Sequence, residues 1–275
     1  MTPPHVAVVL GGGGAKAAAH LGVARALRRA GVVPVHWIGT SMGAVMAAAL
    51  ATGEDPDAIL SRVTRLGRSD VLRNDWPQIG RGIWGRAIFK STPLRRTIES
   101  VVTARDFGEL AKPLTVTAAD VATGAEVAFG AGGESAPLID VLMAACALPP
   151  YFRPVRLNGR TFYDGGLRSP VPIHLAAGIE CNFIIAVHTA PGFDETGPPL
   201  EVPPPLLAAT DTAIGWLMAG TVDLQRQSWD LTPGRPPLVW LRPVSDRAAT
   251  FAATHTAAYA DAGYRAMTQV LEEMQ

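Results

Sequence analysis

The sequence predicts an α/β fold, a single three-layer α/β/α domain with a mostly parallel central sheet. Two apolar runs rich in β-branched residues, Val6–Leu10 and Val32–Ile38, are typical of strands that such a sheet buries on both faces. Each run is followed by a glycine-containing turn and then by apolar residues at helical spacing. Two strand–turn–helix units in succession indicate parallel strands covered by helices.

The other elements follow from apolar spacing and from glycine and proline punctuation. In the two units, helices are expected at Ala15–Ala30, ended by Gly31, and at Ala44–Thr52, closed by Gly53. Further helices are expected at Asp57–Leu66, Pro93–Val102, Leu138–Leu148, Leu206–Trp229 and Ala249–Met274, and further strands at Leu114–Asp120, Glu126–Phe129, Val155–Phe162 and Phe183–Val187. Ser91 and Thr92 are candidate N-caps. The Pro- and Gly-rich stretch Asp194–Pro205 is expected to be an exposed loop.

The composition is that of a globular protein. Of 275 residues, 48% are hydrophobic and 17% are charged, which excludes extensive disorder and favours one large domain. The 24 Lys and Arg residues balance the 24 Asp and Glu residues, so the chain lacks the excess of positive charge that nucleic-acid binding requires. We therefore expect no nucleic-acid partner.

Neither a targeting segment nor a metal site is evident. Met1–Pro4 carries no basic side chain, and the longest apolar stretch, Ala44–Ala51, is well below the ~18 residues that span a bilayer. The six histidines are scattered, and Cys146 and Cys181 share no ligand spacing. We expect a cytoplasmic protein without a metal ion or other cofactor.

The segment Gly39-Thr40-Ser41-Met42-Gly43 matches the pattern G-x-S-x-G between a predicted strand and a predicted helix. This is the setting of a nucleophile elbow, in which a tight turn exposes the serine hydroxyl at the N-terminus of a helix. The glycines allow the backbone to approach itself closely. The alternative is a serine that only caps an ordinary helix.

An activated serine needs a base, and the sequence offers two candidates. His255 is the only late histidine, but it lies in a helical pattern with no strand end to aim it. Asp164 follows a predicted strand and precedes Gly165 and Gly166, which permit a backbone path that brings the carboxylate close to another loop. Asp-Gly-Gly alone is also a common turn, so it indicates a catalytic base only in combination with the elbow serine.

The run Gly11–Gly14 between the first strand and helix also needs a function. A dinucleotide fingerprint that starts at Gly12 fails, because Ala17 stands at its third glycine and no acid follows about 20 residues later. The P-loop pattern is absent as well. What remains is an oxyanion hole formed by the backbone amides of this turn beside Ser41, because consecutive strands are usually neighbours.

Three motifs, Leu10–Lys16, Gly39–Gly43 and Asp164–Gly166, together resemble the bacterial patatin-like phospholipases. The connecting segments at Pro113–Phe129, Ala144–Pro154 and Asp164–Ile173 are similar to that family as well. The resemblance implies a patatin-like fold, a catalytic Ser-Asp dyad of Ser41 and Asp164, and an oxyanion hole of Gly12, Gly13 and Gly14. It gives supporting positions to Lys16, Gly39, Gly43, Gly165 and Gly166.

The resemblance also sets the expected domain organisation and shows two departures. It covers roughly residues 6–190, so we expect a catalytic core over 1–190 and a C-terminal loop and helices over 191–275 that pack on the same domain. Lys16 and Ala17 stand where the family usually has Arg and Gly. Lysine keeps the positive charge of arginine without its five-donor fork. Ala145 replaces a common serine.

We therefore expect a serine acyl hydrolase that cleaves carboxylic ester bonds of lipids through an acyl-enzyme. Two alternatives stay open: an acyltransferase or thioesterase with the same dyad, and a non-catalytic phosphate- or nucleotide-binding module. Leu148, Tyr151 and Phe152 are candidates for an acyl-chain wall or for plain core. The segment Arg73–Lys90 interleaves tryptophans with cations, which suits peripheral contact with a membrane, or packing over the mouth of the active site.

Overall fold

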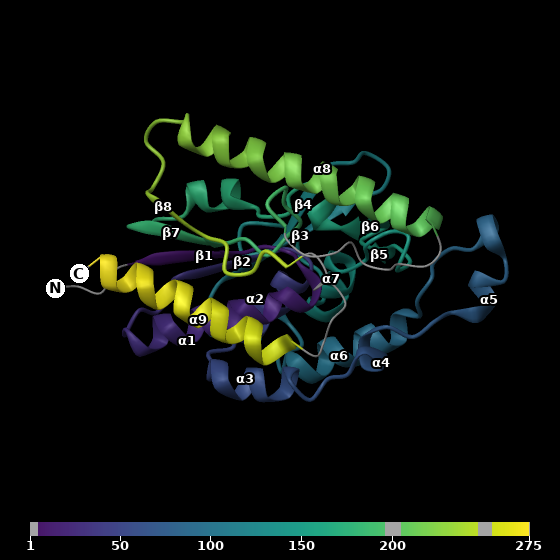
Figure 1. The fold of residues 1–275 in the computed structure, drawn as a ribbon, viewed down its shortest axis with the longest axis horizontal. Helices are drawn as coiled ribbons and strands as arrows, with labels where there is room; N and C mark the ends of the chain where they lie inside the picture. The colour runs from purple at the N-terminus through teal and green to yellow at the C-terminus, as the bar shows by residue number, and fades with distance from the viewer. Residues whose placement is uncertain (1–4, 196–204, 247–254, 275) are drawn as a thin grey trace.

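The computed structural model describes residues 5–195, 205–246 and 255–274, and it contains one mixed sheet between layers of helices (Figure 1). Its strands are β1 (Val6–Leu10), β2 (His36–Gly39), β3 (Leu114–Asp120), β4 (Glu126–Gly130), β5 (Val155–Leu157), β6 (Arg160–Asp164), β7 (Phe183–Val187) and β8 (Leu238–Leu241). The order is β5-β6-β3-β2-β1-β7-β8, with β4 also paired to β3. From β3 to β8 the pairings are parallel, whereas β4, β5 and β6 pair antiparallel.

Helices cover both faces of the sheet. The α-helices are α1 (Ala18–Arg29), α2 (Met42–Ala51), α3 (Pro56–Val63), α4 (Arg68–Val71), α5 (Trp76–Ile79), α6 (Ser91–Val101), α7 (Leu138–Ala145), α8 (Pro205–Asp230) and α9 (Thr256–Glu273). Short 3-10 turns are η1 (Gly14–Ala17), η2 (Gly82–Trp84), η3 (Phe107–Glu109), η4 (Gly165–Leu167) and η5 (Ile173–Gly178). None of the described helices combines the length and apolar character needed to cross a bilayer.

Alternate residues of β1 belong to two separate hydrophobic clusters, which is the physical basis of the three layers. Val6, Val8 and Leu10 pack in the cluster that includes α1, α2, α6 and α7. Ala7 and Val9 face the opposite cluster, which includes Val222 and Trp229 of α8. Successive side chains of a strand point to opposite faces, so a strand that is apolar throughout needs helices on both sides. The predicted α/β fold is confirmed.

Two expectations about individual elements are corrected, and one further strand is present. Val155–Phe162 is not one strand but the hairpin β5–β6, whose turn residues Asn158 and Gly159 both have positive φ, as a tight hairpin turn requires. Strand β8 is not anticipated by the sequence pattern. Helix α6 begins at Ser91 with Lys90 at the N-cap, so neither Ser91 nor Thr92 caps it.

The C-terminal residues join both the sheet and one helical layer. Strand β8 adds parallel to β7, and α9 lies along α1. The predicted helix start at Ala249 and most of the loop Asp194–Pro205 lie outside the described residues. This arrangement is compatible with residues 191–275 packing on the same domain, and the boundary near 190 stays a prediction.

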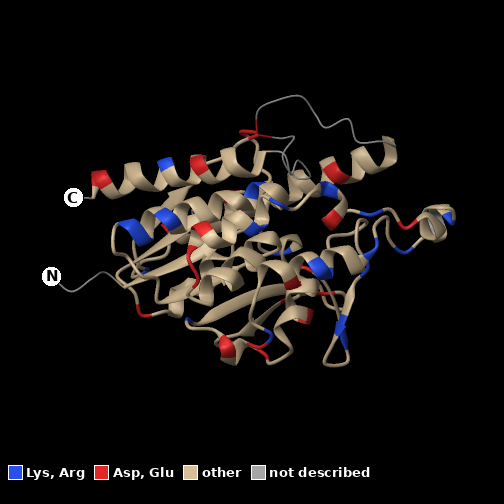
Figure 2. Cartoon of the chain, turned by 90° about the horizontal axis from the view of Figure 1, so that it is seen from below, with Lys and Arg blue, Asp and Glu red and all other residues tan. Residues whose placement is uncertain are grey.

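Residues 73–90 form a projecting segment, called the arm below. The arm is closed at its base by two backbone bonds, Lys90 N to Arg73 O at 2.9 Å and Asp75 N to Ile88 O at 2.8 Å. Helix α5 lies in its outer part and projects beyond the body of the molecule (Figure 1). Positive and negative residues are mixed along the helices, whereas Lys and Arg gather on the arm (Figure 2).

Candidate active site

Ser41 lies at the junction of β2 and α2, where the backbone makes a sharp turn. Its φ of 52° and ψ of −135° are unusual for a residue with a side chain. The two flanking glycines make the turn possible: a Cβ on Gly39 would lie 2.5 Å from the Cα of Ala44, and one on Gly43 would overlap the carbonyl of Leu10. The geometry is that of a nucleophile elbow.

Asp164 ends β6 and lies within hydrogen-bond distance of this serine. Ser41 Oγ donates to Asp164 Oδ2 at 2.7 Å, across 123 residues of sequence. The other carboxylate oxygen accepts from the backbone amide of Gly166 at 2.7 Å, which fixes the carboxylate plane. Gly165 packs so closely on Thr117 of β3 that a Cβ would not fit. The antiparallel pairing of β6 with β3 therefore brings the carboxylate to the elbow.

The environment of Asp164 makes it a better base than an exposed carboxylate. The side chain is buried, and desolvation raises the pKa from 3.8 to about 7, although the bonds from Ser41 and Gly166 act in the lowering direction. An aspartate with an ordinary pKa is a weak acceptor for a serine proton. Burial thus supplies the basicity that the residue type lacks.

The glycine turn runs beside the elbow, but its amides are not equivalent. Gly12 N donates to Pro170 O at 3.0 Å, so this amide is already engaged and is removed from the expected hole. The amides of Gly13 and Gly14 have no partner among the described residues, and both residues line the cavity that contains Ser41. The geometry leaves Gly13 and Gly14 as the candidate oxyanion donors.

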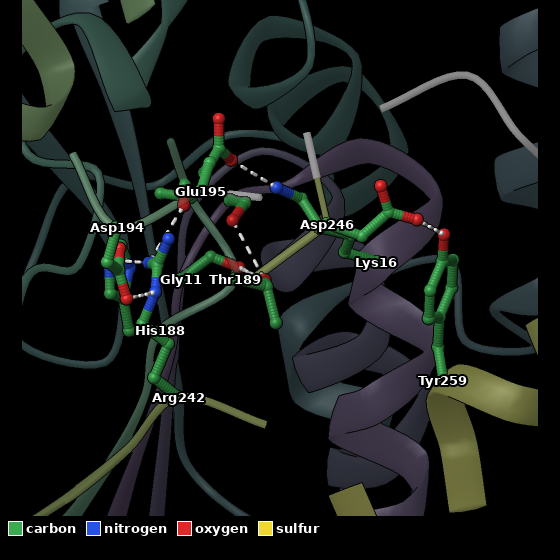
Figure 3. Close-up of polar contacts among 11 residues, drawn as sticks. Gly11, Lys16, His188, Thr189, Asp194, Glu195, Arg242, Asp246 and Tyr259 are labelled. Atoms are coloured by element: carbon green, nitrogen blue, oxygen red, sulfur yellow. Dashed lines mark hydrogen bonds and ion pairs between the residues drawn. The ribbon is translucent and has the colours of Figure 1, made fainter. Parts of the chain in front are cut away.

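Two buried side chains hold the carbonyls of the glycine turn. Thr189 Oγ1 donates to Gly12 O at 2.8 Å and lies 3.3 Å from Gly11 O (Figure 3). His20 Nε2 lies 2.8 Å from Gly11 O. Burial lowers the pKa of His20 to about 4, so the ring is neutral and donates to that carbonyl through Nε2. Because the carbonyl and amide of a trans peptide point in opposite directions, the Thr189 bond turns the amide of Gly13 away from Thr189. Sequence reasoning missed both residues.

Lys16 and its partner form a second support. Its ammonium is buried and lies 2.7 Å from Glu195 Oε1, which belongs to the loop after β7 (Figure 3). In the same loop Asp194 pairs with Arg242 Nε at 2.6 Å. The predicted supporting role of Lys16 stays a prediction, and the structure adds Glu195 as the charge that allows a lysine to be buried there.

Gly13→Ala is expected to lower kcat by about 10²-fold, the usual cost of losing one oxyanion donor. Gly13 has a φ of +156°, and a Cβ would overlap the backbone carbonyl of Thr189, so the turn must shift and its amides turn away. Gly31→Ala is the control, because Gly31 also has a positive φ, +73°, but an added Cβ would meet nothing within 4 Å. Rates normalised to folded protein check this. Equal loss in both variants would contradict it.

A cavity of about 530 Å³ extends from Ser41 and Asp164 between α8 on one side and α2, α3, α4 and α6 on the other. That volume is in the range of small-molecule sites. Leu148, Tyr151 and Phe152 all line it, as their predicted acyl-chain role requires. Much of the remaining lining is apolar: Met46, Val63, Leu66, Val71, Leu72, Leu94 and Val101. Tyr151 OH donates to Asp211 of α8 at 2.8 Å and so ties this helix to the cavity wall.

The remaining candidates lie apart from this constellation. His255 stands at the N-cap of α9, with Nδ1 3.3 Å from the hydroxyl of Tyr259. Within the described ranges, no three His, Cys, Asp or Glu side chains come together as a metal site. Ser41, Asp164 and the backbone amides of the glycine turn are the candidate catalytic groups of the cavity.

Comparison with known proteins gives a consistent match. Residues 8–177 match the model of the patatin-like phospholipase family. An uncharacterised NTE family protein of Mycobacterium tuberculosis is 32% identical over 205 residues, 74% of this chain and 54% of that protein. YqhO of Bacillus subtilis is 26% identical over 208 residues, 66% of this chain and 70% of that protein. The chain thus spans about half the length of the mycobacterial relatives.

Two solved structures share the fold. VipD from Legionella pneumophila superposes with a TM-score of 0.53 and 16% identity, covering 98% of this chain and 67% of that one. ExoU from Pseudomonas aeruginosa, in complex with SpcU, gives 0.51 and 18%, covering 98% and 53%. At such identities the likeness concerns the arrangement of strands and helices alone.

Proposed function

The chain belongs to the patatin-like phospholipase family, and from that premise we propose that it is a serine acyl hydrolase cleaving carboxylic ester bonds of lipids through a dyad of Ser41 and Asp164. The observation that carries the proposal is the 2.7 Å bond from Ser41 Oγ to a buried carboxylate whose pKa is raised to about 7. The apolar cavity next to this pair favours a fatty acyl chain over a polar substrate.

In the proposed first step, Ser41 Oγ attacks the ester carbonyl carbon while Asp164 Oδ2 takes its proton. The carbonyl oxygen becomes an oxyanion, which the amides of Gly13 and Gly14 stabilise. The intermediate then collapses, the bond to the leaving alcohol breaks, and Asp164 returns the proton to the alcohol oxygen. An ester between Ser41 and the acyl chain remains.

In the second step, water attacks this ester and Asp164 takes one of its protons. Collapse of the second oxyanion releases the fatty acid and returns the proton to Ser41 Oγ. The same carboxylate serves as base and acid in each half of the reaction. No histidine is needed, because burial has already moved the pKa of Asp164 towards neutrality.

Labelling with a fluorophosphonate probe, together with a panel of lipid and p-nitrophenyl esters, tests the proposal. We expect labelling at Ser41, located by peptide mass, and release of free fatty acid from lipid. Absence of labelling would favour a binding module instead. Transfer of the acyl group to an added alcohol or thiol in preference to water would identify a transferase.

We also propose that the arm contacts the lipid surface from which the substrate is drawn. Trp76 and Trp84 are 69% and 81% exposed, although tryptophan is normally largely buried. At the base, Phe89 stacks on Tyr151, with ring centroids 5.9 Å apart. Phe89 therefore packs at the cavity wall, whereas α5 and η2 present two indole rings to solvent. Exposed indole rings of this kind insert at the headgroup level of a bilayer.

Trp76→Ala combined with Trp84→Ala is expected to weaken binding to phospholipid vesicles by about tenfold, because two exposed rings no longer enter the interface. Vesicle co-sedimentation measures this. Hydrolysis of a soluble short-chain ester should be unchanged, since neither ring lines the active-site cavity. A parallel loss of soluble-ester hydrolysis would assign the rings a packing role, and unaltered vesicle binding would dismiss the interfacial contact.

A further inference from the structure

A second recess lies between the arm and Arg153 of the body, apart from the active-site cavity. It has a volume of about 480 Å³, and its lining consists of Gln78, Arg81, Trp84, Arg86 and Arg153. None of these five residues lines the cavity around Ser41. A ligand in this recess therefore does not compete with an acyl chain in the active-site cavity.

The chain builds this recess from a small folded turn. Gln78 is buried, and its Oε1 accepts from the backbone amide of Arg86 at 3.1 Å. Gly85 packs so tightly on the carbonyl of Gln78 that a Cβ would overlap it. These contacts fix the backbone on both sides of η2, from which Arg81 and Arg86 project. The fold of the turn itself therefore places both arginines in the lining of one recess.

The third arginine comes from a different part of the chain. Arg153 follows Phe152 of the cavity wall, and its guanidinium lies 3.2 Å from Asp75 at the base of the arm. Asp75 is the only acid within residues 73–90. Arg153 thus pairs with the one carboxylate of the arm, and guanidinium groups from both the arm and the rest of the protein line the recess.

Two of the three positive charges of the recess have no ion-pair partner among the described residues. Within residues 5–195, 205–246 and 255–274, neither Arg81 nor Arg86 forms an ion pair. The whole chain has a formal net charge of +0, so this concentration is local and not part of a basic surface. Like charges held together without a counter-ion repel each other, and an anion bound between them removes that cost.

We propose that this recess is a binding site for a phosphate group, in particular the phosphate of an anionic phospholipid headgroup at the lipid surface. Guanidinium forks match phosphate oxygens in bidentate geometry, and three convergent arginines suit a dianionic phosphate monoester best. Exposed Trp84 in the same lining places an indole ring next to that headgroup. The lipid as source rests on the proposed function, whereas phosphate recognition by the recess does not.

The test compares Arg81→Gln/Arg86→Gln with the charge-matched control Arg105→Gln/Arg265→Gln, whose arginines are exposed and form no ion pair within the described residues. Co-sedimentation with phosphatidylcholine vesicles, with and without phosphatidic acid, reports on the lipid source. Titration calorimetry with inorganic phosphate and with glycerol 3-phosphate reports on free phosphate. Neither measurement requires turnover, and thermal unfolding shows that each variant is folded.

We expect the Arg81/Arg86 variant to lose binding to phosphatidic acid vesicles by about 30-fold, since each of the two cations near a lipid surface contributes roughly fivefold. The control should bind like the unaltered protein. Arg81→Lys/Arg86→Lys should restore only part of the binding, because lysine lacks the bidentate fork. Full rescue of vesicle binding by lysine, or an equal loss of binding in the control, would show that positive charge alone attracts the vesicles. Either result would overturn the proposed phosphate site.

The two phosphate sources give separate outcomes. Calorimetric binding of glycerol 3-phosphate that vanishes in the Arg81/Arg86 variant, without vesicle binding, would support the phosphate site and assign it a soluble ligand. No difference between that variant and the unaltered protein in either measurement would overturn the site altogether. An unaltered protein that binds phosphatidic acid vesicles through these arginines but hydrolyses no ester would contradict the proposed function and leave the recess standing.

Discussion

Ser41→Ala is expected to abolish ester hydrolysis, with kcat lowered by at least ~10³-fold, while the protein stays folded. The hydroxyl is the only group of Ser41 that the proposed mechanism uses, and no neighbouring side chain takes over the attack. The methyl group of alanine occupies the same position at the elbow as the Cβ of serine. Initial rates on a p-nitrophenyl ester, with thermal unfolding in parallel, measure both halves of this prediction.

The stability cost of this change is small for a physical reason. Serine and alanine carry the same Cβ at a φ of 52°, so the backbone strain of the elbow is equal in both proteins. What is lost is one hydrogen bond to Asp164, which keeps its bond from Gly166. Ser61→Ala, at an exposed position, is the control and should retain full activity. Substantial turnover by a well-folded Ser41→Ala protein would remove Ser41 from the mechanism.

Local sequence patterns were sufficient where the structure depends on local physics. The strand Val6–Leu10, the elbow and the left-handed glycines at 31 and 53 follow from runs of apolar residues and from backbone sterics. Patterns failed where a contact crosses the chain. Strand β8 has four apolar residues between prolines and becomes a strand only because β7 offers an unpaired edge.

The site shows the same division. The residue types at positions 41 and 164 were visible, but their 2.7 Å bond depends on β6 pairing with β3. The engagement of the Gly12 amide by Pro170 and the hold of Thr189 on the Gly12 carbonyl link residues more than 150 positions apart. No local pattern encodes such contacts. The raised pKa of Asp164 is a further example, because burial is a property of the folded molecule.

Asp164→Asn is the second change with a large expected effect, a fall in kcat of about 10²- to 10⁴-fold with little change in KM. The asparagine side chain is similar in shape and can still accept from Gly166, but it cannot take the proton of Ser41. The apolar cavity that binds the acyl chain is unaltered. Steady-state kinetics on one soluble ester distinguish the two parameters, and a rise in KM at constant kcat would assign Asp164 to substrate binding instead.

The unaltered protein should show the titration of this carboxylate in its pH profile. The base acts only when ionised, so kcat/KM should rise with pH, reach half its maximum near pH 7, and level off above. Neutral His20, with a pKa of about 4, does not titrate in this window. A half-maximum near pH 4 would mean that Asp164 is an ordinary exposed-type carboxylate, and the dyad would need another source of basicity.

The same burial predicts that Asp164→Asn stabilises the fold at alkaline pH. The pKa of Asp164 is raised on folding, so the unfolded chain loses this proton near pH 4 and the folded protein near pH 7. Folding stability therefore falls as pH rises between these values, by at most about 4 kcal/mol, and the cost is fully present above pH 7. Asparagine never ionises, so the variant does not lose this stability as the pH rises.

Thermal unfolding at pH 4 and pH 8 tests this. We expect equal stability of the two proteins at pH 4 and a higher Tm for Asp164→Asn at pH 8. Asp120→Asn is the matched control, since its buried carboxylate lies 3.7 Å from Arg160 and accepts from the amide of Ala122, so removing its charge breaks favourable contacts. If Asp164→Asn is no more stable than the unaltered protein at pH 8, burial of the ionised carboxylate does not destabilise the folded protein. A gain in stability together with the loss of kcat would show that the fold gives up stability to keep a basic carboxylate beside Ser41.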